Sequence, residues 1–179
     1  MALSKILLHT CCGPCSTYVV KSLREQGFNV TGYFYNPNIQ PLAEYERRLE
    51  TMKQYVTTVG LELLTPSVSP SEADRHLPLD KGENKWGLRP KDCENCYRVR
   101  LLSTAQKAQE LGFKFFSTTL LISPYQKIEL IKKIGDEIGV EIGVEFFWQD
   151  FRCGYRQSQA MAKQLKLYRQ KYCGCSPGL

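Results

Sequence analysis

Several common features are missing from this sequence of 179 residues. No apolar run approaches the roughly 20 residues that a membrane-spanning helix needs, and residues 1–8 lack the length and the flanks of a signal peptide. We therefore expect a cytoplasmic protein with no membrane contact. Internal repeats and low-complexity segments are also absent, which argues against a repeat architecture.

Histidine is scarce. The chain has only His9 and His76, which are too few and too isolated for a histidine-based metal site. We expect His9 to be a hydrogen-bonded core residue, because it follows a predicted buried strand. The eight cysteines contrast with this scarcity. In a reducing compartment, clustered cysteines favour metal binding or redox catalysis over structural disulfides.

Acidic residues are absent from 151–179. The basic residues of this segment are Arg152, Arg156, Lys163, Lys166, Arg169 and Lys171. They account for the whole formal net charge of +6, since acidic and basic residues balance in the rest of the chain. Such a localised excess predicts a polyanionic partner, although a solvated helix face would explain the charge equally well.

Short apolar runs alternate with amphipathic segments along the chain, which predicts an α/β fold. We expect strands at 6–8, 29–35, 61–65, 115–120 and 145–148, and helices at 16–26, 41–59, 93–110, 123–138 and 155–172. Residues 66–92 show little periodicity. The expected architecture is a single domain over 1–179, a three-layer α/β/α sandwich with a parallel five-stranded sheet in an order near 3-2-1-4-5. The basic final helix and a Cys-x-Cys tail occupy 151–179. The loops after the first and fourth strands would then flank the ligand crevice.

Seven of the eight cysteines fall into three clusters. These are Cys11-Cys12-x-x-Cys15, Cys93-x-x-Cys96 and Cys173-x-Cys175. A Cys-x-x-Cys pair at the start of a helix is a strong metal-ligand pattern, because the turn directs both thiolates at one point and the helix dipole lowers their pKa. We expect the remaining cysteine, Cys153, to be a buried free thiol.

The cysteine pattern leaves several kinds of site open. A four-thiolate site can hold either zinc or an iron–sulfur cluster, and a structural zinc site would use Cys12, Cys15, Cys93 and Cys96. Cys12-Gly-Pro-Cys15 also equals the redox motif of thioredoxins. Against a thioredoxin stand the extra Cys11, the lack of a preceding tryptophan and the other cysteine pairs, which that motif leaves unexplained.

Five ordered motifs resemble those of the QueH family of epoxyqueuosine reductases. They are Leu8-His-Thr-Cys-Cys-Gly-Pro-Cys-Ser16, Tyr35-Asn-Pro-Asn-Ile39, Asp92-Cys-Glu-Asn-Cys-Tyr-Arg98, Thr118-Thr-Leu-Leu-Ile-Ser-Pro-Tyr125 and Tyr172-Cys-Gly-Cys175. The resemblance implies an enzyme that reduces the epoxide of epoxyqueuosine in a tRNA anticodon loop to queuosine, without cobalamin. It also implies an adenine-nucleotide α-hydrolase-like fold (HUP or PP-loop-like) that has lost its ATP chemistry.

The resemblance further implies roles for individual residues. Cys11, Cys12, Cys93 and Cys96 would hold a [4Fe–4S] cluster, and Cys173 with Cys175 would form a redox-active pair. Removing an epoxide oxygen takes two electrons and two protons, so an electron donor is needed, and an additional iron ion could act as a Lewis acid on that oxygen. Cys15 and Asp92 are candidates to hold such an ion. Asp92 is also the expected N-cap of the helix that begins at Cys93.

The tRNA would be held through its phosphates by Arg152, Arg156 and Lys163. Aromatic side chains could stack on unpaired bases, and the candidates are Tyr33, Tyr35, Trp148 and Tyr155. Two other classes remain open. A PP-loop-like tRNA-thiolating enzyme should bind ATP, which the missing glycine-rich loop after the first strand argues against. A zinc-stabilised RNA-binding module would be colourless when purified.

Overall fold

A computed structural model describes residues 4–66 and 92–175 of the chain. Its centre is a five-stranded, all-parallel sheet in the order β3-β2-β1-β4-β5, as predicted. The strands are β1 (Ser4–His9), β2 (Phe28–Tyr33), β3 (Glu62–Leu64), β4 (Phe115–Thr118) and β5 (Glu145–Phe146). Apart from its two ends, the irregular stretch predicted at 66–92 lies outside the described residues, and so does His76.

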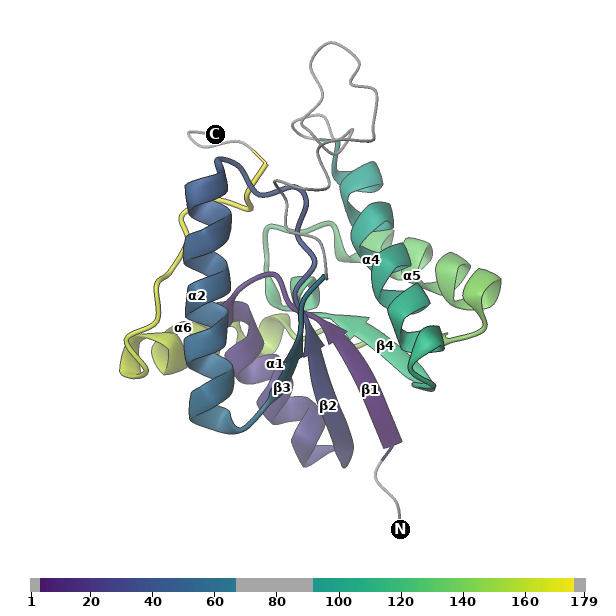
Figure 1. Cartoon of the computed structure of the whole chain (residues 1–179), viewed down its shortest axis with the longest axis horizontal. Helices are drawn as coiled ribbons and strands as arrows, with labels where there is room; N and C mark the ends of the chain where they lie inside the picture. The colour runs from purple at the N-terminus through teal and green to yellow at the C-terminus, as the bar shows by residue number, and fades with distance from the viewer. Residues whose placement is uncertain (1–3, 67–91, 176–179) are drawn as a thin grey trace.

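Helices cover both faces of this sheet (Figure 1). They are α1 (Gly13–Glu25), α2 (Leu42–Val59), α4 (Cys93–Glu110), α5 (Ile128–Ile142) and α6 (Tyr155–Gln164), with short 3-10 helices at Thr119–Ile122 and Arg152–Gly154. Helix α1 packs against α6, α2 and β2, whereas α4 packs against α5, β1 and β4. This is a three-layer α/β/α arrangement, and the more specific α-hydrolase-like class remains a prediction. None of the helices among residues 4–66 and 92–175 is both long and apolar enough to cross a bilayer.

The central strand explains why the cysteine loop sits in the interior. Ile6, Leu7 and Leu8 of β1 have no exposed surface, because helices cover both of its faces. All five strands run in the same direction, so their carboxyl ends meet at one edge of the sheet. The loop after β1 therefore emerges in the middle of that edge, between the loops that follow β2 and β4.

The predicted helix start at Ser123-Pro124 is wrong. Residues 123–127 form a turn in which the backbone N–H of Gln126 donates to the carbonyl of Ser123 (3.2 Å), and α5 begins at Ile128. Proline after serine is compatible with a turn as well as with a helix start. The consequence is that this turn, rather than a helical face, follows Thr119–Ile122 at the carboxyl edge of the sheet.

The final helix is also shorter than predicted, since α6 ends at Gln164 rather than at Tyr172. Lys166 adopts a left-handed conformation (φ 54°), and the N–H of Leu167 donates to the carbonyl of Ala162 at 2.9 Å. This is the Schellman arrangement that usually carries glycine at the left-handed position. Beyond it, residues 165–175, which we call the C-terminal arm, leave the helix and return along α2 toward the carboxyl edge of the sheet (Figure 1).

Candidate metal centre

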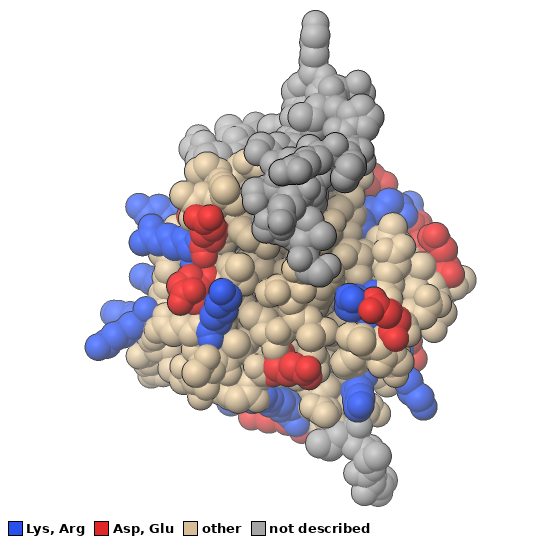
Figure 2. Space-filling model, in the orientation of Figure 1, with Lys and Arg blue, Asp and Glu red and all other residues tan. Residues whose placement is uncertain are grey.

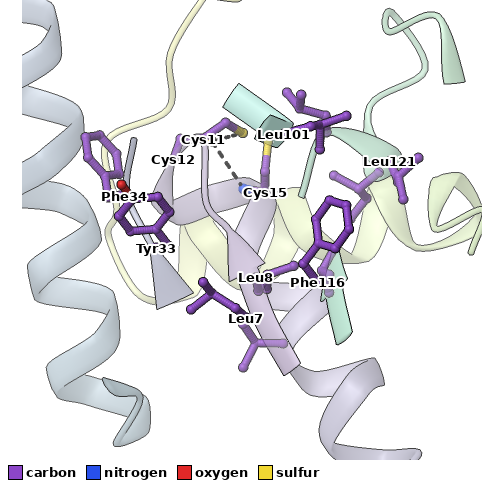
Figure 3. Packing of buried hydrophobic residues seen from close by; sticks show 14 of the residues in the cluster. Leu7, Leu8, Cys11, Cys12, Cys15, Tyr33, Phe34, Leu101, Phe116 and Leu121 are labelled. Atoms are coloured by element: carbon purple, nitrogen blue, oxygen red, sulfur yellow. Dashed lines mark hydrogen bonds between the residues drawn. The ribbon is translucent and has the colours of Figure 1, made fainter. Parts of the chain in front are cut away.

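The three cysteines of the first loop form one compact group of sulfur atoms. Their Sγ atoms all lie within 4.8 Å of one another, and those of Cys11 and Cys12 are 3.6 Å apart (Figure 3). Cys12 caps helix α1 by accepting a hydrogen bond from the N–H of Cys15 (3.4 Å). Thr119, beyond the end of β4, accepts from the N–H of Cys11 (3.0 Å) and donates its hydroxyl to Cys11 Sγ (3.3 Å). Two neighbouring strands thus fix the loop in place.

Negative charge in this group concentrates on Cys11. The pKa of Cys11 lies well below its usual value, because the thiols of Cys12 and Cys15 and the hydroxyl of Thr119 can donate hydrogen bonds to its thiolate. The pKa of Cys12 is raised by burial, and that of Cys15 is raised by hydrogen bonds with the other two thiols. The group thus consists of one thiolate stabilised by two thiols. A soft metal ion could bind all three sulfurs if it displaced the protons of the two thiols.

A large cavity opens beside these sulfurs. Its volume is about 590 Å³, and it is lined by five cysteines, Cys11, Cys15, Cys93, Cys173 and Cys175. A smaller adjoining cavity of about 30 Å³ is lined by Asp92, Cys93, Cys96, Cys173 and Cys175. The structure therefore brings the start of α4 and the C-terminal arm to the first loop.

The sulfur of Cys15 lies within 4.8 Å of those of Cys11 and Cys12, so this grouping alone does not decide which two of the three are ligands. Cys11 and Cys15 line the large cavity, whereas Cys12 is not among its lining residues. Asp92 is the N-cap of α4, accepting from the N–H of Asn95 at 3.1 Å, as expected. The prediction for Cys153 is wrong, because its thiol is exposed on the Arg152–Gly154 turn, 3.8 Å from the hydroxyl of Tyr18.

His9 is the hydrogen-bonded core residue that the sequence predicted. Its Nε2 lies 3.1 Å from the carbonyl of Tyr35 and 3.2 Å from Oδ1 of Asn36. Two acceptors at Nε2 place the proton there, so Nδ1 accepts from the hydroxyl of Thr118 (2.8 Å). Burial, together with the positive charge of Arg100, lowers the pKa of His9 to about 4, which keeps the imidazole neutral.

Three polar residues at the cavities were not predicted from the sequence. Gln170 of the C-terminal arm donates its side-chain N–H to Cys12 Sγ at 2.7 Å. Arg100, on α4, is 3% exposed, lines the smaller cavity and donates to the carbonyl of Cys96 (3.1 Å). Arg48, on α2, is 2% exposed and lines the large cavity. The positive charge of Arg100 lowers the pKa of Cys96, but burial has the larger effect and the pKa of Cys96 is raised overall.

The aromatic residues predicted to stack on bases differ in where they lie relative to the large cavity. Tyr33 and Tyr35 stack on each other at 6.0 Å, and Trp148 is half-buried, whereas Tyr155 lines the large cavity. Tyr125, from the turn where a helix had been predicted, lines the same cavity, is 82% exposed and contacts Tyr155 edge to face at 6.3 Å. The contact between Tyr125 and Tyr155 was not predicted from the sequence, which indicated a helix over 123–138.

Basic side chains gather on the side of the molecule where α2 and α6 lie (Figure 2). Arg156 and Lys163 are on α6, and Arg169 and Lys171 of the C-terminal arm line the large cavity. Arg152 is already paired with the carboxylate of Asp150 at 2.6 Å. Of the three residues predicted to contact RNA, Arg152 therefore has the least free charge to offer.

The residues around the cavities fit a thiolate-bound iron–sulfur group. Thiolates are the ligands of such clusters, and the described cavities are lined with cysteines from three separate segments. Oδ1 of Asn38, buried at the smaller cavity, has no hydrogen-bond partner among the described residues. An amide oxygen pairs with a donor or a cation rather than with the sulfurs of a cluster, so the fit rests on the cysteines alone.

Fold and site together define an α/β protein with a buried thiol centre at the carboxyl edge of a parallel sheet. The family model described as epoxyqueuosine reductase QueH matches residues 6–178. The chain therefore belongs to the QueH family of epoxyqueuosine reductases, which are oxidoreductases.

Curated relatives agree with this family over nearly the whole chain. The QueH of Dehalococcoides mccartyi is 39% identical over 172 residues, covering 96% of this chain and 90% of that protein. The QueH of Thermotoga maritima is 37% identical over 172 residues, covering 95% and 88%. The QueH of Streptococcus pyogenes is 37% identical over 178 residues, covering 95% and 68%.

Proposed function

We propose that this protein reduces the epoxide of epoxyqueuosine in a tRNA anticodon loop to queuosine, using a [4Fe–4S] cluster held by Cys11, Cys12, Cys93 and Cys96 and no cobalamin. The observation that carries this proposal is the convergence of cysteines from the first loop, α4 and the C-terminal arm on one cavity. When bound, the cluster would carry electrons one at a time, and an additional iron ion near Cys15 and Asp92 would act as a Lewis acid.

The pair Cys173 and Cys175 matches the stoichiometry of the reaction. Oxidising two thiols to a disulfide releases two electrons and two protons. Deoxygenating an epoxide to an alkene consumes two electrons and two protons, and the oxygen leaves as water. Sγ of Cys173 and Sγ of Cys175 are 3.5 Å apart and line both cavities, so a small movement would form the bond. A cellular electron donor would then restore the dithiol.

The cavity mouth has the chemistry to receive an unpaired nucleoside. Tyr125 and Tyr155 offer aromatic faces for a base, and Arg169 and Lys171 offer positive charge to the flanking phosphates. Sequence-specific RNA recognition usually targets unstacked loop bases, so an anticodon loop is a fitting substrate. We propose Arg152, Arg156 and Lys163 as more distant phosphate contacts.

The proposed function predicts a brown protein with reductase activity. After anaerobic purification, we expect about four iron and four sulfide per chain, and conversion of epoxyqueuosine to queuosine in tRNA when a reductant is supplied. Nucleoside mass spectrometry of digested tRNA measures the conversion. A colourless, zinc-containing protein that binds RNA without converting it would instead identify a zinc-stabilised RNA-binding module.

Reversing the charge of Arg152, Arg156 and Lys163 to glutamate should weaken tRNA binding without loss of iron. Each lost phosphate contact lowers the slope of log affinity against log salt by about 1. Among the single variants, Arg152→Glu should have the smallest effect, because Asp150 already neutralises that guanidinium. Binding is measured by titration at several salt concentrations.

Lys5→Glu is the matched control, since Lys5 lies near the start of β1, away from the carboxyl edge that carries the cavity. If tRNA affinity did not change with salt, or if Lys5→Glu weakened binding as much as the α6 variants, phosphate contacts by this segment would be ruled out.

A further inference from the structure

Arg48 is a buried charged residue whose guanidinium is occupied on all three nitrogens. Nε donates to Oε1 of Glu44 at 2.7 Å, one helical turn earlier on α2. Nη1 donates to the carbonyl of Cys173, and Nη2 donates to the carbonyl of Tyr172, both at 3.0 Å. Two successive backbone carbonyls of the Cys-x-Cys segment are therefore bound by one planar side chain from a helix about 125 positions earlier in the chain.

The surroundings fix this guanidinium in one orientation. Glu44 also accepts a hydrogen bond from the hydroxyl of Tyr168 (2.9 Å), so its carboxylate is held from both sides. The Tyr172 ring lies 5.1 Å from the Arg48 guanidinium carbon. A charge buried to this extent is costly unless hydrogen bonds and an ion pair compensate it, and here the compensation includes the backbone of the arm itself.

The segment between the two thiols is shaped to this contact. Gly174 has φ +125°, and an added Cβ would lie 2.9 Å from Ile39 and 3.3 Å from Nη1 of Arg48. Its carbonyl accepts from the N–H of Gln40 at 2.7 Å, and the hydroxyl of Tyr172 donates to the carbonyl of Gln40 at 2.6 Å. Glycine is needed here both for its conformation and for the close approach to the arginine.

We propose that Arg48 is a positioning residue that holds the Cys173-Gly174-Cys175 pair against the cysteine-lined cavities. It does not take part in electron transfer. It keeps the arm from swinging into solvent, so that both thiols line the cavities shared with Cys93. The consequence for the reaction rests on the proposed function, but the positioning itself is a property of the structure.

Hydrogen exchange of the iron-loaded protein directly tests the hold of Arg48 on the C-terminal arm, which we call the clamp. The N–H of Gln40 bonds to the carbonyl of Gly174 and so reports whether the arm is docked. The N–H of Thr10 bonds to the carbonyl of Tyr33 (2.8 Å) inside the sheet and reports global opening. In Arg48→Lys, which keeps the charge but loses the planar fork, we expect the Gln40 peptide to exchange about tenfold faster and the Thr10 peptide to be unchanged.

Two further variants cover the case in which Arg48→Lys fails to fold. Glu44→Gln with Arg48→Met removes the ion pair as a unit and leaves no uncompensated buried charge. Gly174→Ala disturbs the same contact from the side of the arm, because the added Cβ would lie 3.3 Å from Nη1 of Arg48. Both should accelerate exchange at Gln40 alone. Lys53→Met is the matched control, because Lys53 is an exposed basic residue of the same helix and none of the side-chain contacts within the described residues joins it to the arm.

The outcomes separate this inference from the proposed function. Wild-type exchange at Gln40 in all three clamp variants would overturn the role of Arg48, whatever the activity. Faster exchange with a fall in kcat and an unchanged affinity for tRNA would support it fully. If exchange is faster in the variants but the wild-type protein does not convert epoxyqueuosine, the role of Arg48 in holding the arm is supported and the proposed function is contradicted.

Discussion

Anaerobically purified Cys11→Ala, Cys12→Ala, Cys93→Ala and Cys96→Ala variants are expected to lose most of their iron. A ligand removed from the metal itself should cost at least the roughly tenfold loss of affinity that changes beyond the direct ligands cause. The 590 Å³ cavity brings cysteines of both groups together, so either group alone would leave the cluster incompletely held. Iron and sulfide analysis with the visible spectrum measures the loss.

Cys153→Ala is the control for this series, because Cys153 is exposed and is not among the cavity-lining residues. The most informative comparison is between variants of the first loop, because its three thiols form one group of possible ligands. Full iron in Cys12→Ala together with loss of iron in Cys15→Ala would show that the proposed ligands of this loop are wrong. Retention of iron by all four variants would show that these cysteines do not hold the cluster.

Replacing Cys173 and Cys175 together by alanine is expected to abolish multiple turnover while iron content stays normal. If the pair relays electrons, a single turnover driven by a strong chemical reductant should survive. Repeated turnover should fall by about 100-fold or more, as expected when a chemically essential group is removed. A disulfide ring with one residue between the cysteines is strained, so the oxidised pair should be labile and a cellular electron donor should readily restore the dithiol.

The alternatives for the pair give different results. Loss of both single and multiple turnover would assign Cys173 and Cys175 to metal ligation or to the chemical step. Full activity in both assays would leave the pair without a function in the reaction. Single variants at each position, assayed in the same way, would show whether one thiol acts alone.

The layers of the fold could be predicted because they depend on local patterns. A run such as Ile6 to Leu8 reads as a strand buried on both faces, and the alternation of strands with helices sets a parallel sheet. The place of the cysteine loop at the sheet edge follows from that order. The capping role of Asp92 follows from its position just before an amphipathic helix.

The residues that were missed depend on long-range contacts. Arg48 sits on a helix where charged side chains normally face solvent, and its hydrogen bonds to the carbonyls of Tyr172 and Cys173 compensate its burial. Arg100 is also buried, although its hydrogen bond to the carbonyl of Cys96 lies within its own helix. The turn that holds Tyr125 is not distinguishable from a helix by sequence, because Ser-Pro suits a helix start and a turn alike. Cys153 was assigned to the core from the usual burial of lone cysteines, which a surface turn overrides.

Lys166 makes the reach of the C-terminal arm depend on a single backbone torsion. Had α6 continued to Tyr172, eight further residues rising about 1.5 Å each would have carried Cys173 roughly 12 Å along the helix axis. The left-handed turn at Lys166, which is followed by the buried Leu167, directs the chain toward the two cavities instead. Mutational tolerance at this surface lysine should therefore follow the preferences of the αL region, in which glycine and asparagine substitute readily and β-branched residues do not. A position with no contact to the thiols thus constrains how enzymes with this arm can diverge in sequence.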